Sequence, residues 1–407
     1  MNIEDLKTAI SITPVPGGQD ARADRFVRYF EARGIKTVAF CGEGLFQEGA
    51  TKKWTKVERG KFGFSDRIKS KLENGYIGPF ILYLLWLIKI FTLNVRLAVR
   101  LFGCQRADII VLHECSRFPA VWFILVARGG VFHYDAHDFY SGIEPSDLVS
   151  DFQRVWIYRT NRLLERWLLR RADVFTSVSD GIARMYDETF GHRPETVRNV
   201  ADGASAEGTS VRLRDALKLR PEELLLCVIG NCKPGMDFGG VLRALRELQP
   251  GAHLVLAGGG HESTKRLARD LRVDQRVHDL GFVPTRELVS VVSQCDAACL
   301  VYVDRSDNYR YALPNGLFQS LAAKLPIIYL DLPEIHQLLD GFGIGIRLAA
   351  NDTRNWIRAI HKVRHDHGFV ADQKTKLEIA SSELVWQVEC HRLERAILNG
   401  LASRRKV

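Results

Sequence analysis

A histidine and a carboxylate stand side by side just after an apolar run of the sequence. His137 and Asp138 follow Val131–Asp135, whose composition predicts a β-strand. Such a pair can hydrogen-bond a sugar or a leaving group and can move a proton, so we take both as candidate catalytic residues. An isolated histidine is more often structural, but a place at the carboxyl end of a strand favours function. His113 and Glu114 occupy a similar place, where both interpretations stay open.

A polar segment that leads through a proline into a predicted helix supplies a second set of polar groups. Proline is favourable at a helix start because its missing N–H costs nothing there, and the first turn leaves free N–H groups. This arrangement suits a diphosphate at the helix end and a ribose close by. The candidate binding residues of this segment are Asn308, Tyr309, Arg310, Tyr311, Leu313, Pro314, Asn315 and Gln319.

Three glycine-rich turns follow predicted strands. Gly17 and Gly18 follow the first strand, Gly230-Asn231-Cys232-Lys233 follows the first strand of the second half, and Gly258 begins a third turn. Their backbone N–H groups could face an anion, with Lys233 beside a phosphate. None matches a dinucleotide fingerprint or a P-loop, and the alternative is that the glycines only permit the turns.

The elements that must position these residues alternate between strands and helices along both halves of the chain. In the first half, strands are predicted at 8–13, 37–41, 108–113, 131–135, 174–178 and 196–200. In the second half, they are predicted at 224–230, 253–257, 277–282, 297–303, 327–330 and 345–348. Alternation with helices predicts an α/β fold of two doubly wound, Rossmann-like domains that face a central cleft, where the site is expected.

The predicted domain boundaries follow from composition. Residues 1–200 form an amino-terminal domain, the Gly-, Ala- and Ser-rich stretch 201–210 a linker, and 211–366 a second domain. Residues 367–407 are expected to form a helix that packs back onto the first domain.

The totals fit an ordinary globular protein. The 407 residues are 46% hydrophobic and 26% charged, so a disordered or fibrous chain is excluded. The eight cysteines show neither a CxxC nor a Cys/His cluster, so we expect no metal site and a reduced, cytosolic setting. The amino terminus shows no secretion signal.

Positive charge is concentrated in one stretch. Residues 51–106 carry twelve basic and three acidic side chains, an excess equal to the formal net charge of +9. The stretch includes Tyr76–Val95, 20 residues long with a single charge at Lys89, which matches the length of a bilayer span. We reject a span because the segment lies between strands of one predicted sheet.

Two interpretations of this stretch remain open: a helix buried in the first domain, or an interfacial helix on an anionic membrane. The candidate membrane residues are Lys52, Lys53, Lys56, Trp86 and Lys89. Nucleic acid is a poorer explanation of the charge because no recognition module accompanies it.

The second half closely resembles the carboxyl-terminal domain of GT-B glycosyltransferases, in particular glycosyltransferase family 4. The resemblance rests on the turn Gly230–Gly235, on His253–Glu262, on Arg276–Tyr302 and above all on Ala312–Asp331, similar to the Pro-Asn-Lys-Leu-Phe-Glu segment of relatives that build bacterial surface polysaccharides. In the first half, Tyr134–Tyr140 and Leu163–Tyr186 are similar to family segments.

The resemblance implies roles for single residues. His137 would lie near the donor sugar, Gly17 and Gly18 near the donor diphosphate or the acceptor, and Lys233 and Arg310 would neutralise phosphates. Four positions depart from the family pattern. Asn231 replaces the usual arginine, Gly316 the usual lysine, and Tyr311 and Gln319 the usual glutamates. The amide of Gln319 can still hydrogen-bond ribose hydroxyls.

The function that the resemblance implies is sugar transfer from a UDP- or GDP-sugar to a lipid-linked oligosaccharide or polysaccharide. The enzyme would be of the hexosyltransferase type, would retain the anomeric configuration and would use no metal or other cofactor. We expect it in the cytoplasm, peripheral on the cytoplasmic face of the inner membrane. Two alternatives stay open: a nucleotide-sugar epimerase or hydrolase of the same fold, and a non-catalytic scaffold subunit.

Overall fold

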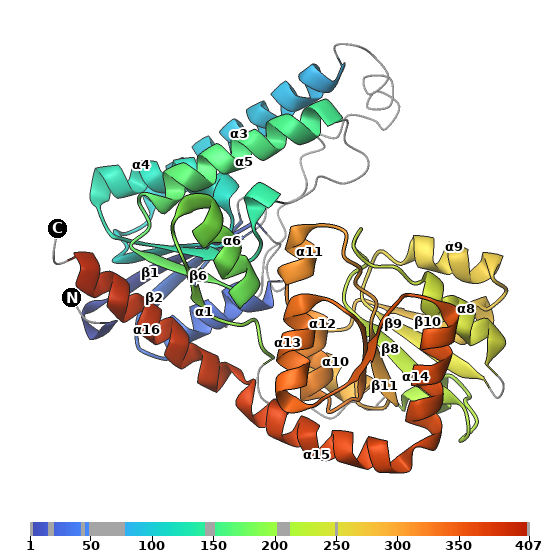
Figure 1. Cartoon of the computed structure of the whole chain (residues 1–407). Coiled ribbons are helices and arrows are strands. Elements are labelled where there is room, and N and C mark those ends of the chain that lie inside the picture. Colours follow the sequence, from blue (N-terminus) through green and yellow to red (C-terminus); the bar gives the residue numbers. More distant parts are fainter. Residues whose placement is uncertain are drawn as a thin grey trace. The chain divides into compact units, whose positions relative to one another are not determined.

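The computed structural model describes residues 3–14, 20–41, 45–48, 78–142, 151–201, 212–248 and 251–404. The chain divides into two compact units, each an α/β sandwich (Figure 1). The first unit comprises Met1–Val197 and Cys390–Val407, and the second comprises Arg198–Glu389. The expected linker 201–210 lies outside the described residues, apart from its first residue.

The first unit is built on a seven-stranded sheet with the order β3-β2-β1-β4-β5-β6-β7. All neighbours are parallel except β2 and β3. The parallel strands are largely buried, as expected where helices cover both faces of a sheet. The strands are β1 (Thr8–Thr13), β2 (Lys36–Cys41), β3 (Leu45–Glu48), β4 (Ile109–Leu112), β5 (Val131–Ala136), β6 (Val174–Ser177) and β7 (Glu195–Thr196).

Helices cover the two faces of this sheet. On one face, α1 places Phe26 5.6 Å from His133 of β5, ring centre to ring centre. On the opposite face, Phe118 of α4 stacks on Phe132 of β5 at 5.3 Å, and α3 and α5 run beside α4 (Figure 1). These helices are α1 (Ala21–Glu31), α3 (Gly78–Gly103), α4 (Phe118–Arg128), α5 (Asp151–Leu169) and α6 (Asp180–Phe190), with short 3-10 turns η1 (Ile3–Asp5), η2 (Cys115–Arg117) and η3 (Tyr140–Gly142).

The second unit has a parallel six-stranded sheet with the order β10-β9-β8-β11-β12-β13. Its core includes Trp356, which is fully buried. The strands are β8 (Leu224–Ile229), β9 (Ala252–Ala257), β10 (Val277–Gly281), β11 (Ala297–Leu300), β12 (Ile327–Leu330) and β13 (Ile346–Leu348). The helices are α7 (Leu213–Ala216), α8 (Gly239–Glu247), α9 (Glu262–Asp270), α10 (Thr285–Val292), α11 (Asp307–Tyr311), α12 (Asn315–Ala322), α13 (Pro333–Phe342), α14 (Thr353–His365) and α15 (His367–Glu383), with a 3-10 turn η4 (Asp274–Arg276).

The final stretch is divided between the units. Helix α15 packs on the second unit, where Leu377 is buried and Gln373 accepts a hydrogen bond from the Gly345 N–H at 2.6 Å. Most of α16 (Trp386–Arg404) belongs to the first unit, where Glu394 pairs with Arg33 at 3.2 Å. The single helix expected over 367–407 is therefore two helices with different partners.

The expected α/β architecture of two doubly wound sheets is confirmed, and a few short elements were missed. Strand β3 is only four residues long, and α11 is a five-residue helix inside what the sequence predicts to be a loop, with Arg310 as its one good helix former. Helix α13 begins at Pro333, only two residues after β12, so no long polar loop marks its start in the sequence.

Candidate active site

The switch point of the first sheet lies between β1 and β4, because the chain leaves β1 toward β2 on one side and returns to β4 on the other. Ligands of doubly wound sheets bind outside the carboxyl ends of the strands at such a point. Strand β1 ends at Thr13, His113 directly follows β4, and Asp135 lies near the end of β5. Polar side chains therefore gather at the edge where a ligand is expected.

A buried carboxylate at this edge is held by a guanidinium from α1. Arg22 Nε donates to Asp135 Oδ2 at 2.8 Å, and Arg22 Nη2 donates to Oδ1 at 2.6 Å. Arg22 Nη1 donates to the Val197 carbonyl, and the Thr176 hydroxyl donates to Asp135 Oδ1, both at 2.6 Å. The two charged side chains are 1% and 0% exposed, so each depends on the other for its charge.

Two histidines share the second oxygen of this carboxylate. His113 Nδ1 lies 2.8 Å from Asp135 Oδ2, and His137 Nε2 lies 3.1 Å from the same atom. The Ser11 hydroxyl lies 3.1 Å from His113 Nε2, so we assign the His113 proton to Nδ1. His113 is fully buried, whereas 21% of the His137 side chain is exposed. His137 is therefore the member of this network that can meet a ligand.

Burial and charge act on the two histidines with opposite results. Burial lowers the pKa of His113. Burial also opposes protonation of His137, but the charges of Asp20 and Asp135 outweigh it and raise its pKa. Burial would raise the pKa of Asp135, but Arg22 holds it well below the usual range. The network thus pairs a neutral His113 with a carboxylate and favours a protonated His137.

Asp20 connects this network to the start of α1. Its carboxylate caps the helix by accepting from the Ala23 N–H at 3.1 Å, and it accepts a hydrogen bond from the Thr13 hydroxyl at 2.5 Å. Burial would raise the pKa of Asp20, but the positive charge of His137 and the hydrogen bonds from Thr13 and Ala23 outweigh it and lower the value. A charge on Asp20 and a proton on His137 therefore stabilise each other.

The same three side chains have the types and spacing that a cation would accept. Ligand atoms of His113, Asp135 and His137 lie within 4.8 Å of one another. Arg22, however, already donates to both oxygens of Asp135. A divalent cation would have to displace or face this guanidinium, so we interpret the cluster as an ion-pair and hydrogen-bond network.

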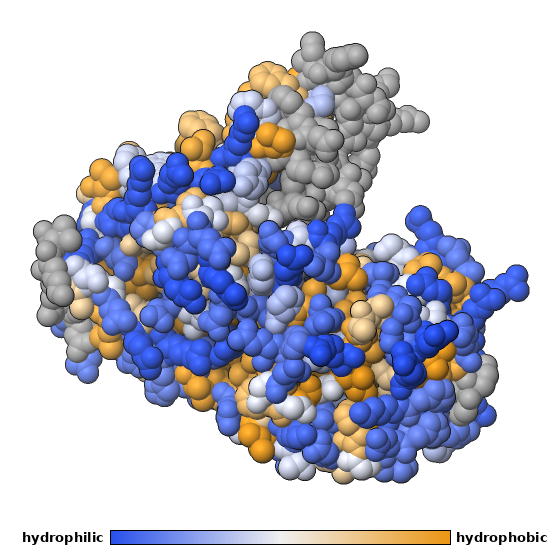
Figure 2. Space-filling model, viewed as in Figure 1, coloured by the Kyte–Doolittle hydropathy of each residue, from blue (hydrophilic) through white to orange (hydrophobic). Residues whose placement is uncertain are grey.

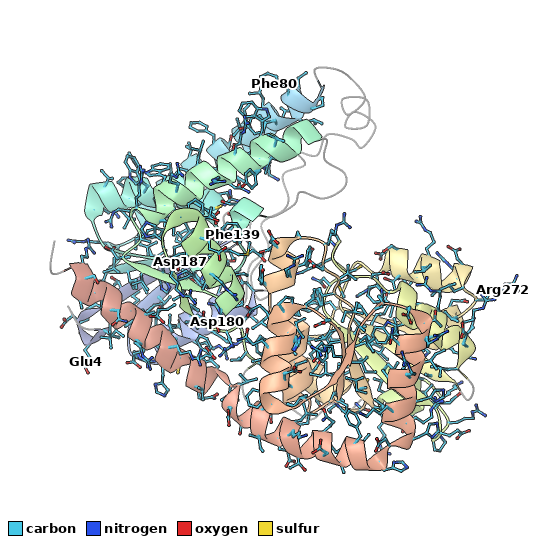
Figure 3. All side chains as sticks on the ribbon, in the orientation of Figure 1. Glu4, Phe80, Phe139, Asp180, Asp187 and Arg272 are labelled. Carbon is cyan, nitrogen blue, oxygen red and sulfur yellow. The ribbon has the colours of Figure 1, made fainter. Side chains whose placement is uncertain are left out.

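The segment that follows His137 is anchored by a second buried carboxylate. Glu165 of α5 accepts from the Ser141 N–H at 2.8 Å and from the hydroxyls of Ser141 and Tyr186. The Tyr186 hydroxyl also lies 3.2 Å from the Asp138 carbonyl, and Phe139, labelled in Figure 3, packs edge-on against the Tyr186 ring. Burial raises the pKa of Glu165 to about 7. These contacts fix the backbone on the carboxyl side of His137.

The switch point of the second unit, between β8 and β11, contains a very tight glycine turn. Gly230 has φ +120° and Gly258 has φ +156°, values that suit only glycine. A Cβ on Gly258 would lie 2.2 Å from the Gly230 oxygen. The side chain of Asn231 accepts from the Gly259 N–H at 2.8 Å and so joins the two turns.

Helix α12 begins against this turn. A Cβ on Gly316 would lie 2.4 Å from the carbonyl oxygen of Ile229, the last residue of β8. The backbone of this helix therefore approaches β8 too closely for any side chain at position 316. Pro314 is the N-cap and offers no side-chain cap, so the first-turn N–H groups have no cap from that side chain.

The other residues predicted in the second unit lie around this turn in different settings. Arg310 of α11 forms a bidentate pair with Asp304, with Nη2 to Oδ2 at 2.7 Å, so its charge is already partly neutralised. Lys233 is exposed, and the Tyr309 ring packs where a side chain on Gly235 would lie. Asn308 and Leu313 are buried, Pro314, Tyr311 and Gln319 are half-buried, and exposed Asn315 accepts from Asn199 at 2.6 Å.

Some of the predicted site residues lie outside the described residues. They are Gly17, Gly18, Lys52, Lys53 and Lys56. The carboxylate that contacts His137 is that of Asp135, whereas Asp138 accepts a hydrogen bond from the Tyr186 hydroxyl through its backbone carbonyl. Glu114 caps η2 by accepting from the Ser116 N–H at 2.9 Å, a structural role.

Sequence reasoning missed Arg22, Asp20 and Asp135. Asp135 could have been found because residues two apart in a strand share a face, and it lies two positions before His137. Arg22 gave no such signal, since its partner is 113 positions away.

Two family models match the chain. The model described as Glycosyltransferase Family 4 matches residues 16–205, and the model described as Glycosyl transferases group 1 matches 224–366. Together they cover most of both units. No curated protein matches the chain in sequence.

Solved structures share the fold over nearly the whole chain. Sucrose-phosphate synthase from Thermosynechococcus elongatus aligns with a TM-score of 0.70 at 12% identity, covering 98% of each chain. Anabaena HepE in complex with UDP-glucose aligns with a TM-score of 0.64 at 13% identity, covering 95% of this chain and 98% of that one. The lipopolysaccharide outer core galactosyltransferase WaaB aligns with a TM-score of 0.58 at 14% identity, covering 96% and 99%.

Two doubly wound units, each with a polar cluster or glycine turn at its switch point, define the class of protein: a glycosyltransferase of the GT-B fold. Within that class, the chain belongs with the glycosyltransferases of the family 4 type.

Proposed function

We propose that the protein transfers a sugar from a UDP- or GDP-linked donor to a saccharide acceptor held at a membrane, a lipid-linked oligosaccharide or polysaccharide. The transfer retains the anomeric configuration and needs no metal ion. The observation that carries the proposal is the position of His137. Its side chain is partly exposed at the switch point, and its Nε2 is hydrogen-bonded to the buried carboxylate of Asp135.

His137 is suited to contact the donor while the charged groups behind it stay fixed. Its Nε2 is engaged by Asp135, so Nδ1 is the nitrogen left for a ligand. Its raised pKa favours the form that donates from both nitrogens. A hydrogen-bond donor that is already held in this orientation stabilises oxygen atoms that gain negative charge during sugar transfer.

The second unit supplies the groups that suit a diphosphate. The Gly230–Gly258 turn and the start of α12 bring backbone N–H groups close to the end of β8, and Lys233 adds a positive charge nearby. Backbone dipoles and basic side chains of this kind support leaving-group stabilisation without a metal. Gly316 also supports an active enzyme. It differs from the residue expected from the family resemblance, but a glycine is what the close approach of α12 to β8 requires.

Retention of the anomeric configuration is supported by the hydrogen bonds that Asp135 and Asp20 already accept. Asp135 accepts from Arg22, Thr176 and His113, and Asp20 accepts from Thr13 and Ala23. Neither is free to act as the general base that direct displacement by an acceptor requires. The solved structures of HepE with UDP and with UDP-glucose support a nucleotide-sugar donor.

Calorimetric titration with UDP- and GDP-sugars, followed by a donor-turnover assay, tests the proposal. We expect one donor to bind and His137→Ala to lower its turnover by about 10²- to 10⁴-fold. His192→Ala is the matched control, since that exposed histidine of the same unit should leave turnover unchanged. The proposal fails if no nucleotide sugar binds, or if both variants behave like the wild type.

Product analysis separates the proposal from its alternatives. Transfer requires an added lipid-linked acceptor and gives a lengthened glycan with the donor's anomeric configuration. A hydrolase or epimerase would release free sugar or an isomer without acceptor, and a scaffold subunit would turn over no donor at all.

A further inference from the structure

Helix α3 presents an apolar face that the rest of the described structure leaves uncovered. It is 26 residues long, and only 11% of its apolar 18-residue stretch is buried. Its exposed apolar residues recur every three or four positions and form one stripe, in which Ile88 is 59%, Phe91 70% and Val99 67% exposed. The alternative that this helix is buried in the first domain is therefore wrong.

The stripe continues onto the two neighbouring helices. Phe102 of α3 meets Phe123 of α4 edge-on at 5.4 Å, and Tyr83 of α3 meets Trp156 of α5 at 5.9 Å. Trp122 of α4 packs on Trp167 of α5 at 5.2 Å. We call this surface of α3, α4 and α5 the three-helix face; it starts near Phe80, labelled in Figure 3.

Hydrogen bonds attach α3 to the neighbouring segments of the first unit, unlike a helix that crosses a bilayer apart from its domain. Asn94 in the middle of α3 donates to the Ser116 carbonyl at 2.8 Å and accepts from the Ala120 N–H at 3.0 Å. The Tyr83 and Thr160 hydroxyls are hydrogen-bonded at 2.7 Å. Helix α3 thus lies along α4 and α5 as part of the first unit, with one side packed and the other exposed.

The charge on this face has a single sign among the described side chains. Helices α3 and α4 contain no acidic residue, and Glu165 of α5 is fully buried. Exposed cations such as Lys89, Arg96 and Arg159 lie between the apolar side chains, and Figure 2 shows orange and blue residues interspersed here. Tryptophans at a polar–apolar boundary with arginines and no acids are typical of surfaces that enter the headgroup region of a bilayer.

We propose that the three-helix face is a monotopic membrane-docking surface that lies flat on an anionic lipid bilayer. A contiguous exposed apolar surface of this extent needs a partner in a water-soluble protein, and the positive charge of its described side chains selects anionic lipid. The proposal holds whichever donor the enzyme uses. It places α4 and α5 at the membrane beside α3, with Trp86 half-buried against Tyr83 and Lys89 exposed.

Flotation of the full-length protein with vesicles tests the docking surface. We expect binding to phosphatidylcholine vesicles that contain phosphatidylglycerol, weaker binding to phosphatidylcholine alone, and release as salt rises. Replacing Phe91, Val99, Phe123 and Leu163 by serine should lower partitioning more than tenfold, because all four side chains are at least half exposed on this face. Phe282→Ser, at a 65% exposed site of the second unit, is the matched control.

Each result decides the question. The proposal is overturned if the wild type does not float, or if the serine variant floats as well as the control while both stay folded by circular dichroism. If the wild type is a dimer by sedimentation, does not float, and the serine variant is a monomer, the face is an interface between copies. Donor turnover in solution should be the same in the serine variant, so failed docking is distinguishable from a failed enzyme.

Discussion

Arg22 and Asp135 form a bidentate ion pair with almost no solvent contact, and the same carboxylate holds His137 at the edge of the first sheet. The position of the exposed histidine therefore depends on a guanidinium from the first helix.

Replacing Arg22 by methionine should destabilise the protein by about 3–5 kcal/mol, because Asp135 would remain buried without its partner. Urea denaturation measures this loss. Adding Asp135→Asn to the variant should restore part of it. The control Arg33→Met breaks a pair whose side chains are 30% and 33% exposed, and should cost at most about 1 kcal/mol. Equal losses in the two single variants would contradict the assignment.

The charge of Asp20 should set the pH dependence of His137. The proton on His137 is lost as pH rises through its raised pKa, so donor turnover should fall on that limb. Asp20→Asn removes a charge that raises this pKa but keeps a side-chain cap for α1, and should move the midpoint to lower pH. An NMR titration of the His137 ring gives the same answer without substrate. Asp187→Asn, a 46% exposed site labelled in Figure 3, should leave the midpoint unmoved.

Gly316→Ala should disrupt the second unit's switch point. The added methyl group would meet the Ile229 carbonyl, so α12 must move away from β8 at a cost of about 1–3 kcal/mol. We expect nucleotide-sugar binding to weaken at least tenfold by calorimetry. Gly341→Ala adds the same group to α13, where nothing lies within 4 Å, and should be neutral or stabilising by up to about 1 kcal/mol. Unchanged binding in Gly316→Ala would remove α12 from the donor site.

His133 should make the protein sensitive to acid. Burial lowers its pKa to about 3, whereas an unfolded chain protonates its histidines near pH 6.5. Between these values the unfolded state binds the extra proton, so stability falls as pH falls, by up to about 1.4 kcal/mol per pH unit. His133→Gln should reduce that slope by about one proton in urea denaturation between pH 6 and pH 4. His192→Gln should leave the slope unchanged, and an unaltered slope in His133→Gln would show that this ring is not the source.

The sequence predicts the sheets better than the site. Strands such as Ile327–Leu330 are continuous apolar runs between turn residues, and the structure places them as predicted. His137 was found because it follows such a strand. Arg22 and Arg25 were not, because an amphipathic pattern places arginines on the solvent side of a helix, yet both are buried in α1. The burial of Arg22 depends on Asp135 of a distant strand, which the local pattern of α1 does not contain.

The exposure of α3 could not be decided from its sequence either. The same apolar run suits a buried helix and an interfacial one, and only the packing of Asn94 and Tyr83 shows which side is covered.

The return of α16 to the first unit affects the order in which the protein can fold during synthesis. Residues 390–404 are made after the entire second unit, yet Gly400 lies so close to the Asp173 carbonyl that a Cβ there would be only 2.4 Å away. The surface of the first unit that binds α16 therefore stays exposed while the ribosome synthesises the second unit. A nascent chain stalled before residue 390 would have a complete second sheet and a first unit still missing its last helix.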